Sequence, residues 1–306
     1  MIDEPATPDT PDTQTPPRAL LDRRGVLGAL GVAGLLPVAA TGSTPPAAVR
    51  APFTSSFLQL DPVESFRQVM RLQRSLLDAD EILHWYHFVM YAVPAEGRTV
   101  PVVRWEGIEL SRHERIGELR YRMHGHNLSY PRDLDSGEFI DAVLNPVTGA
   151  RVPIAPMRLT QDPGLVRSPA GTITLDRASA PPRRDYRVLR REGDWVKVDT
   201  IRVPPATWPQ PFIEGGYEGA LAQHYDDPSQ LWLRTEVSGA YVFPWPAWMQ
   251  MGDRPGHMLG IWSGHKLRSI AELPDEFRRR AEREDAALLA VDRAQFRKPI
   301  AALDPG

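Results

Sequence analysis

Two short clusters of histidine and tyrosine are the residues of this chain best suited to acid–base chemistry. The first contains His124, His126 and Tyr130. Residues two apart share a face of a β-strand, so both imidazoles could reach one ion or one substrate. Because no neighbouring Glu or Asp completes a ligand set and this spacing also arises by chance, we predict no metal site. The three residues remain candidate catalytic groups.

The second cluster contains His84, His87 and Tyr91. In a strand its two histidines point to opposite faces, so at most one of them faces a cavity, with Tyr86 or Tyr91 as a partner in proton transfer. Either histidine, or His113, could instead add a third metal ligand to the first cluster. The alternative is a histidine that is hydrogen-bonded in the core beside packed aromatic rings.

Strands must position both clusters, because the surrounding sequence is rich in aromatic and β-branched residues. Strands are predicted at residues 82–93, 99–110 and 118–130. Turns are predicted at 133–137 and 145–149, with one short strand between them. Turn signals about a dozen residues apart indicate an antiparallel meander.

The same pattern continues towards the C-terminus. Further strands are predicted at residues 171–176, 186–189, 195–203, 231–242 and 258–267. A break is predicted at Gly239, and the glycine-rich segment 215–219 is predicted to be a turn.

Helices are predicted only near the two ends of this β-rich region. Asp61 followed by Pro62 is a typical helix start, and the apolar spacing predicts a helix over 62–70 whose continuation to Leu77 is open. A strongly charged helix is predicted over 273–290. The predicted fold class is mainly β: an antiparallel meander forming a barrel-like or sandwich domain, with a short N-terminal helix and a charged C-terminal helix.

Composition excludes several classes of function. The chain has no cysteine, which excludes disulfides, thiolate catalysis, iron–sulfur clusters and cysteine-ligated zinc. Its formal net charge of -3 gives no electrostatic footprint for nucleic acid. The sequence also lacks a P-loop, a Gly-x-Ser-x-Gly elbow and a His-Glu-x-x-His helix. We predict no cofactor and no nucleic-acid partner.

The N-terminal region resembles an export signal. Arg23 and Arg24 precede an apolar, Gly/Ala-rich run that ends at Ala40, as in bacterial twin-arginine signals. The run is too short for a permanent membrane span, which needs ~20 apolar residues. We therefore predict the twin-arginine export machinery as a partner and a periplasmic or secreted location. The alternative is a buried helix or a membrane anchor.

Three regions follow from this signal. Residues 1–40 are predicted to be a disordered leader and signal peptide, and residues 41–56, rich in Pro, Ser, Thr and Ala, a linker. Residues 57–306 are predicted to form a single β-rich domain.

A proline- and tryptophan-rich stretch at 240–257 is the most unusual segment of the predicted domain. Its three prolines exclude a helix interior and a central strand, so it is predicted to be a rigid bend that forms either a core wall or a pocket lining. The candidate ligand-binding residues are Trp85, Trp105, Arg112, Trp245, Trp248 and Met249. Arg112 has an alternative role as a cross-strand ion-pair partner of Glu106.

Several motifs together resemble the domain of unknown function 1838 family. They are Leu60-Asp61-Pro62, Asn145-Pro146-Val147-Thr148-Gly149, the run from Phe243 to Gly256, Ser263-Gly264-His265-Lys266-Leu267 and Glu272-Leu273-Pro274. The likeness covers nearly all of residues 57–280. It implies an export signal, which members often carry, but no activity and no catalytic residue.

Three functions are compatible with the sequence. The first is binding of an apolar or aromatic small molecule in a cavity of the β domain. The second is a cofactor-independent acid–base enzyme, an isomerase, lyase or hydrolase, that uses the same cavity. The third is a periplasmic interaction protein whose Trp/Met surface binds a partner.

Overall fold

A computed structural model gives the architecture of residues 55–78, 80–174, 184–203 and 212–291. The chain divides into two units, Met1–Ala51 and Pro52–Gly306, and every described residue belongs to the second. The predicted leader and signal at residues 1–40 lie outside the described residues.

The described unit is mainly β, as the sequence predicts. Its strands are β1 (Ser55–Phe57), β2 (Asp80–Pro94), β3 (Val100–Gly117), β4 (Arg120–Arg132), β5 (Ala142–Leu144), β6 (Arg151–Pro153), β7 (Met157–Ser168), β8 (Gly171–Thr174), β9 (Arg184–Glu192), β10 (Trp195–Val203), β11 (Ile213–Leu221), β12 (Glu236–Phe243) and β13 (Gly256–Leu267). The helices are α2 (Pro62–Gln73), α3 (Ala222–Tyr225) and α4 (Asp275–Glu284), with short 3-10 turns η2 (Ala247–Met249), η3 (Ile270–Glu272) and η4 (Ala286–Leu289). No helix within these ranges has both the length and the apolar character to cross a membrane.

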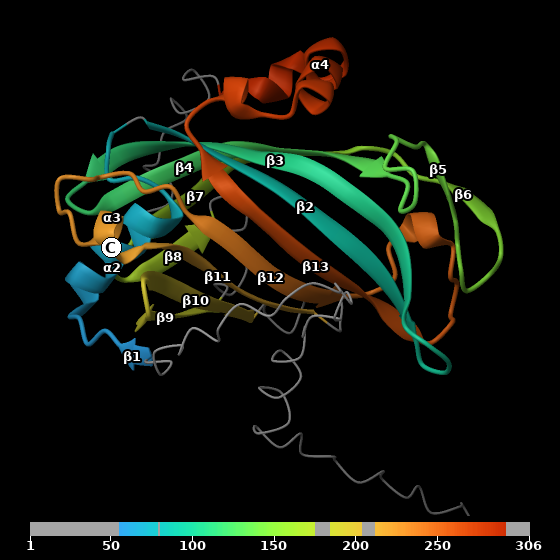
Figure 1. The fold of residues 1–306 in the computed structure, drawn as a ribbon, viewed down its shortest axis with the longest axis horizontal. Coiled ribbons are helices and arrows are strands. Elements are labelled where there is room, and N and C mark those ends of the chain that lie inside the picture. The colour runs from blue at the N-terminus through green and yellow to red at the C-terminus, as the bar shows by residue number, and fades with distance from the viewer. Residues whose placement is uncertain (1–54, 79, 175–183, 204–211, 292–306) are drawn as a thin grey trace, which may run out of the picture. The chain divides into compact units, whose positions relative to one another are not determined.

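Eleven strands form one antiparallel sheet in the order β1-β9-β10-β11-β12-β13-β2-β3-β4-β7-β8. Seven of the ten neighbouring pairs are consecutive along the chain, which confirms the predicted meander. The pairing of β13 with β2 joins the C-terminal half to the N-terminal half and puts both strands in the middle of the sheet (Figure 1). β5 and β6 form a separate two-stranded hairpin.

The sheet is strongly curved. From β7, Arg167 Nη1 donates to Gln73 Oε1 on α2 at 3.3 Å. The Nε2 of the same glutamine donates to Thr200 Oγ1 on β10 at 3.2 Å. One helix residue therefore contacts strands near opposite ends of the sheet, so α2 lies on the concave face. β1 and β8 are the edges of the described sheet, which gives the predicted domain an open, sandwich-like form.

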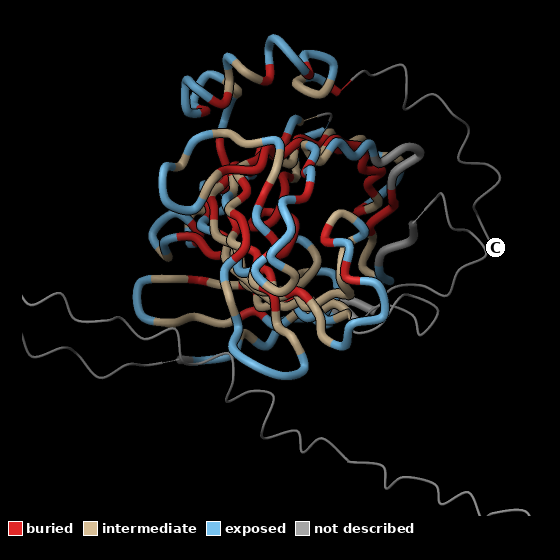
Figure 2. Tube along the Cα trace, turned by 90° about the vertical axis from the view of Figure 1, so that its right-hand side faces the viewer, coloured by how far each residue is buried: buried red, intermediate tan, exposed pale blue. Residues whose placement is uncertain are grey.

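The α4 helix covers the opposite, convex face (Figure 1). Its Phe277 ring is 4.8 Å from Trp85 of β2 and 5.3 Å from Tyr130 of β4, both edge to face. Asp285, directly after the helix, accepts a hydrogen bond from the Tyr130 hydroxyl at 2.7 Å. Figure 2 shows buried residues along the strands and on the inner side of α4. The strongly charged helix predicted over 273–290 is thus a shorter helix with an apolar face on the sheet.

The α2 helix begins as predicted and ends later. Asp61 caps it by accepting from the backbone N–H groups of Val63 and Glu64, both at 2.9 Å. At its other end, Lys266 Nζ donates to the carbonyls of Arg71, Leu72 and Arg74 at 3.2, 2.9 and 2.8 Å. The buried amine of Lys266 thus satisfies carbonyls that the helix leaves unpaired at its C-terminus, while burial lowers the pKa of this lysine to about 7.

The prediction of a turn at 215–219 is wrong, because this segment is the middle of β11. The prediction of a break at Gly239 is also wrong, since β12 runs through it. Gly216 and Gly239 pair across the two strands. A Cβ on Gly239 would be 2.5 Å from Trp262 Cζ2, and one on Gly216 would be 3.0 Å from the same atom. These glycines therefore make room for an indole that lies flat on the sheet.

The proline- and tryptophan-rich stretch begins in β12 and ends in β13, and its residues 244–255, which include all three prolines, form the bend that connects the two strands. Trp245 Nε1 donates to the Arg254 carbonyl at 2.9 Å, which closes the bend. Asn145 Nδ2 donates to the Met249 carbonyl at 2.7 Å and ties the bend to the turn before β6. Trp245 and Trp248 are half-buried against a core cluster that includes Met249 and Met251. From Pro244 onward the stretch is therefore a core wall at one end of the sheet, whereas Tyr241 and Phe243 belong to β12 and line the cavity described below.

Candidate functional site

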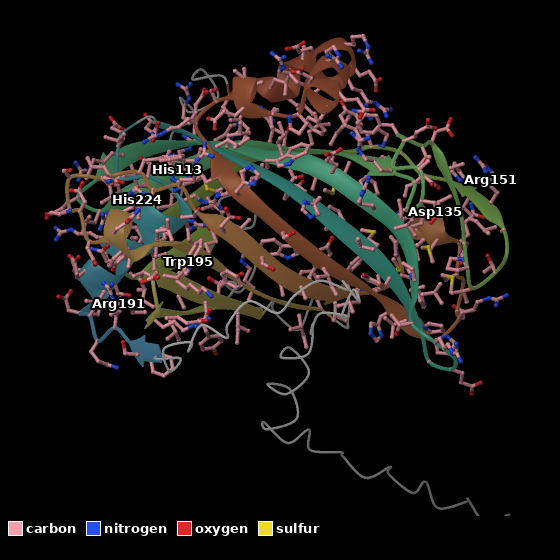
Figure 3. All side chains as sticks on the ribbon, in the orientation of Figure 1. His113, Asp135, Arg151, Arg191, Trp195 and His224 are labelled. Carbon is pink, nitrogen blue, oxygen red and sulfur yellow. The ribbon has the colours of Figure 1, made fainter. Side chains whose placement is uncertain are left out.

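A cavity of about 410 Å³ lies on the concave face of the sheet. It is lined by Arg74, His84, Tyr86, Phe88, Glu109, Asn127, Met157, Leu159, Arg202, Phe212, Glu214, Glu218, Val237, Tyr241, Phe243 and Trp262. The volume is in the range of pockets that hold drug-sized ligands. Buried His113 on β3 marks the α2 end of the sheet in Figure 3, and Asp135 and Arg151 mark the opposite end.

The period of two along β2 selects the residues of that strand that face the cavity. His84, Tyr86 and Phe88 share its concave side. Antiparallel pairing places His84 opposite Glu109 of β3, and Glu109 opposite Asn127 of β4. The Tyr86 hydroxyl donates to Asn127 Oδ1 across the intervening strand. Three strands thus contribute one row of polar groups to the wall.

Aromatic rings form most of the rest of the wall. Trp262 lies flat over the glycine pair of β11 and β12, and Tyr241 lies over Gly260 of β13, where a Cβ would be 2.6 Å from its Cζ. The Phe88 and Tyr241 rings are 6.0 Å apart, and Tyr241 stacks on Phe243 at 5.0 Å. Because these glycines have no side chains, the rings lie flat against the sheet. Open space remains above the rings, and this space is the cavity on the concave face.

Charged residues gather at the end of the cavity nearest α2. Arg74, the residue after the helix, pairs with Glu109 at 2.9 Å, and its Nη1 lies 3.3 Å from His84 Nδ1. Arg202 of β10 pairs with Glu214 of β11. The cavity therefore has an aromatic, apolar part and a polar end in which each of these guanidinium groups has a carboxylate partner.

Burial and these neighbours shift the pKa values at the polar end. Burial opposes ionisation of Glu109, but Arg74 and the other cations outweigh it and lower its pKa to about 2. Burial, assisted by Arg74, lowers the pKa of His84 well below its ordinary value. Burial raises the pKa of Glu218, although Arg74 and Lys266 oppose the shift. Near neutral pH, Glu109 is ionised and His84 is uncharged.

The hydrogen bond from Arg74 fixes the tautomer of His84. A guanidinium only donates, so His84 Nδ1 accepts and the ring proton is on Nε2. That Nε2–H faces Glu218 Oε2 at 3.7 Å. This distance is too long for a hydrogen bond. The donor and the acceptor therefore face each other across a gap.

A smaller cavity of about 20 Å³ borders Glu218. It shares Arg202, Glu214, Glu218 and Trp262 with the larger one and adds Gln73, Thr200, Gly216 and Tyr217. Its size fits a single water molecule.

Of the six candidate catalytic residues, only His84 lines the cavity. His87 points to the convex face, where its Nε2 lies 3.0 Å from Ser263 Oγ. Tyr91 pairs with Leu259 of β13, which follows the same alternation to the convex side.

The first histidine cluster also lies on the convex face. His124 and His126 do share a face, with ring centroids 6.0 Å apart, and His126 Nδ1 lies 3.1 Å from Thr160 Oγ1. Tyr130 packs under α4. In the described residues no group of three or more His, Cys, Asp or Glu is arranged to hold a metal ion. The sheet separates this cluster from His84, so the two do not form one site.

None of the six candidate ligand-binding residues is among the residues that line the larger cavity. Trp105 is on the concave side but fills the core, stacked on Phe88 at 5.9 Å. Trp85 packs under α4. Arg112 pairs with Glu81, whereas Glu106 pairs with Arg132, so the alternative pair of Arg112 with Glu106 is not formed. Trp245, Trp248 and Met249 belong to the bend described above.

Sequence reasoning missed Glu218, Glu109, Arg74 and Trp262. Glu218 lies in the segment for which the sequence predicts a turn, and Arg74 follows a helix whose end the sequence does not define. A signal for Glu109 exists in hindsight: it is a carboxylate between Ile108 and Leu110, in a stretch of β3 with buried residues on both faces. Such a residue is rarely buried without a partner.

Comparisons with protein families, with curated proteins and with solved structures gave no match. The class of protein is therefore defined by the fold and the site alone. It is a curved antiparallel β domain with an amphipathic cavity on its concave face. The resemblance to the domain of unknown function 1838 family stays a prediction.

Proposed function

We propose that this protein binds an apolar, aromatic small molecule in the cavity on the concave face of its sheet. The observation that carries the proposal is the 410 Å³ cavity, whose wall combines aromatic rings with a few convergent polar groups. Ligand pockets in proteins have this composition. Trp262, Tyr241 and Phe88 offer flat apolar surfaces for a ring system.

The ring surfaces are held in place before any ligand arrives. Trp262 is fixed against two glycines, and Phe88 is stacked on Trp105. A preformed wall reduces the ordering cost of binding. The site therefore supports binding of a rigid ring system better than binding of a flexible chain.

Native mass spectrometry of the protein from its native source tests this proposal. We expect the native mass to exceed that of the denatured chain by one small molecule that an organic solvent extracts. A protein that carries no such molecule, and that also fails to bind neutral aromatic compounds after purification, would contradict the proposal.

A cofactor-independent acid–base enzyme is the second candidate. The observation that favours it is Glu218, a cavity carboxylate with a raised pKa that faces an uncharged histidine. The test is incubation of the extracted ligand with the wild type and with Glu218→Gln. Conversion by the wild type alone supports an enzyme. An unchanged ligand in both supports simple binding.

The interaction-protein alternative has less support, because Trp245 and Trp248 pack against buried core residues. We further propose export by the twin-arginine route to a periplasmic or secreted location. Arg23 and Arg24 carry this proposal. Changing both to Lys should abolish export, and cell fractionation measures it. Unchanged export would contradict the twin-arginine route.

A further inference from the structure

The buried polar atoms of the cavity wall that lack a hydrogen-bond partner include His84 Nε2, Glu218 Oε2 and Arg74 Nε. A buried polar atom left unsatisfied is costly. His84 Nε2 and Glu218 Oε2 come from strands on either side of the middle of the sheet and lie 3.7 Å apart. One ligand atom placed beside both of them would satisfy both.

The direction of the two hydrogen bonds defines that atom. His84 presents an N–H, because its other ring nitrogen accepts from Arg74. Glu218 presents a carboxyl oxygen. A hydroxyl oxygen accepts one hydrogen bond and donates another, so it suits this pair better than a group that only donates. Two atoms 3.7 Å apart can both lie within hydrogen-bond distance of one oxygen placed to the side of the line between them.

The charges of the cavity disfavour an anionic ligand. Arg74 is paired with Glu109, which is ionised, and Arg202 is paired with Glu214. Lys266 is held by three carbonyls. A carboxylate on the ligand would find Arg74 and Arg202 each already paired with a carboxylate and would approach the three glutamates of the cavity wall. A neutral polar group has no such cost.

From this geometry we infer that the ligand is a neutral aromatic alcohol or phenol, whose hydroxyl lies beside His84 Nε2 and Glu218 Oε2, within hydrogen-bond distance of both, while its ring system lies against Trp262 and Tyr241. The inference rests on the proposed binding function and adds the chemical class of the ligand. It also identifies His84 and Glu218 as the residues that determine specificity.

Three compounds that share one ring system test the inference: naphthalene, 2-naphthol and 2-naphthoate. Each is titrated against the protein loaded with the neutral dye Nile red, and displacement gives relative affinities. Two hydrogen bonds of ordinary strength predict that 2-naphthol binds about tenfold more tightly than naphthalene. The anion 2-naphthoate should bind most weakly.

Variants assign the preference to the two residues. In His84→Phe and in Glu218→Leu, 2-naphthol and naphthalene should bind within about threefold of each other, because only one of the two hydrogen bonds remains and its partner is no longer held in place. Tyr86→Phe is the matched control, since it removes a cavity hydroxyl that is already bonded to Asn127. It should keep the preference. Glu218→Gln, which retains a polar group, should keep part of it and guards against misfolding of the leucine variant.

The outcomes distinguish the inferred class of ligand from the proposed binding function. Equal binding of naphthalene and 2-naphthol to the wild type, or stronger binding of 2-naphthoate, overturns the inference and leaves the binding function in place. A preference for 2-naphthol that survives in both His84→Phe and Glu218→Leu also overturns it. Failure of all three compounds, and of the dye, to bind contradicts the proposed function itself.

Discussion

His84 of β2 and Glu218 of β11 face each other across the concave side of the sheet, with Nε2 and Oε2 3.7 Å apart. Strands β13 and β12 lie between theirs, so only the curvature of the sheet brings the two side chains together. Arg74 orients the histidine from the end of α2. The site thus depends on the curvature, which the glycines under Trp262 permit.

Gly239→Ala should destabilise the fold by about 1–3 kcal/mol, the usual cost of overpacking. The added Cβ would lie 2.5 Å from the carbonyl oxygen of Gly215 and 2.5 Å from Trp262 Cζ2. Gly215→Ala is the matched control, because its Cβ would meet nothing closer than Thr200 O at 3.8 Å. Urea unfolding measures both. Similar urea midpoints for the two variants would show that the packing of Trp262 does not require a glycine at position 239.

Glu109 should make the fold acid-sensitive. Its pKa is about 2 in the folded state against an ordinary value of 4.5. The unfolded chain therefore binds more protons in this window, and stability falls as the pH falls. The contribution is fully present above about pH 4.5 and amounts to on the order of 3 kcal/mol, lost as the pH falls through 2.

Denaturant unfolding between pH 5 and pH 2 measures this contribution in Glu109→Gln and in the wild type. The variant should be less stable at pH 5, because Arg74 loses its partner, and its stability should depend less on pH. Glu236→Gln, at an exposed position of β12, should follow the wild type. Parallel curves for Glu109→Gln and the wild type would contradict this account of the Arg74–Glu109 pair.

Asp285 should hold the α4 segment on the sheet. It accepts from the Tyr130 hydroxyl at 2.7 Å and from Arg158 Nη2 at 2.9 Å. Asp285→Ala leaves the buried hydroxyl unpaired and should cost about 2–3 kcal/mol. Asp275→Ala, which removes an exposed carboxylate at the start of α4, should cost below ~1 kcal/mol. Equal losses in thermal unfolding would show that Asp285 is only a surface ion-pair residue.

Much of the fold follows from the sequence. The aromatic and β-branched residues from Ile82 to Val93 predict β2, and 195–203 predicts β10 with its observed bounds. Turn residues between such runs predict the meander. The capping residue Asp61 predicts where α2 begins. Each of these signals is local, so a single segment is enough to read it.

The parts of the fold that the sequence does not predict depend on contacts between residues far apart in the chain. The glycines of β11 are typical of a turn until Trp262, which covers Gly216 and Gly239, is known to lie beside them. The end of α2 depends on Lys266, which comes from the last strand of the sheet. No local signal carries either contact.

The candidate site, like the fold, follows only partly from local signals in the sequence. Alternation along a strand predicts that His84 and His87 face opposite sides and that His124 and His126 share one. It does not tell which side is concave. That choice depends on the curvature and on where α4 packs, and it places His84 in the cavity but His124, His126 and Tyr130 under the convex surface.

Equilibrium titration with the neutral dye Nile red tests the central claim, that the concave cavity binds an apolar aromatic molecule, most directly. The compared proteins are the wild type, Leu159→Glu and Ile261→Glu. Leu159 lines the cavity, whereas Ile261 lies on the convex side of β13, and both are about half exposed, so neither change should unfold the protein.

We predict saturable binding of one dye per wild-type chain, unchanged binding to Ile261→Glu, and affinity at least about tenfold lower for Leu159→Glu, because the dye would desolvate a carboxylate. Absence of saturable binding to the wild type, or equal affinity of both variants, would contradict the claim.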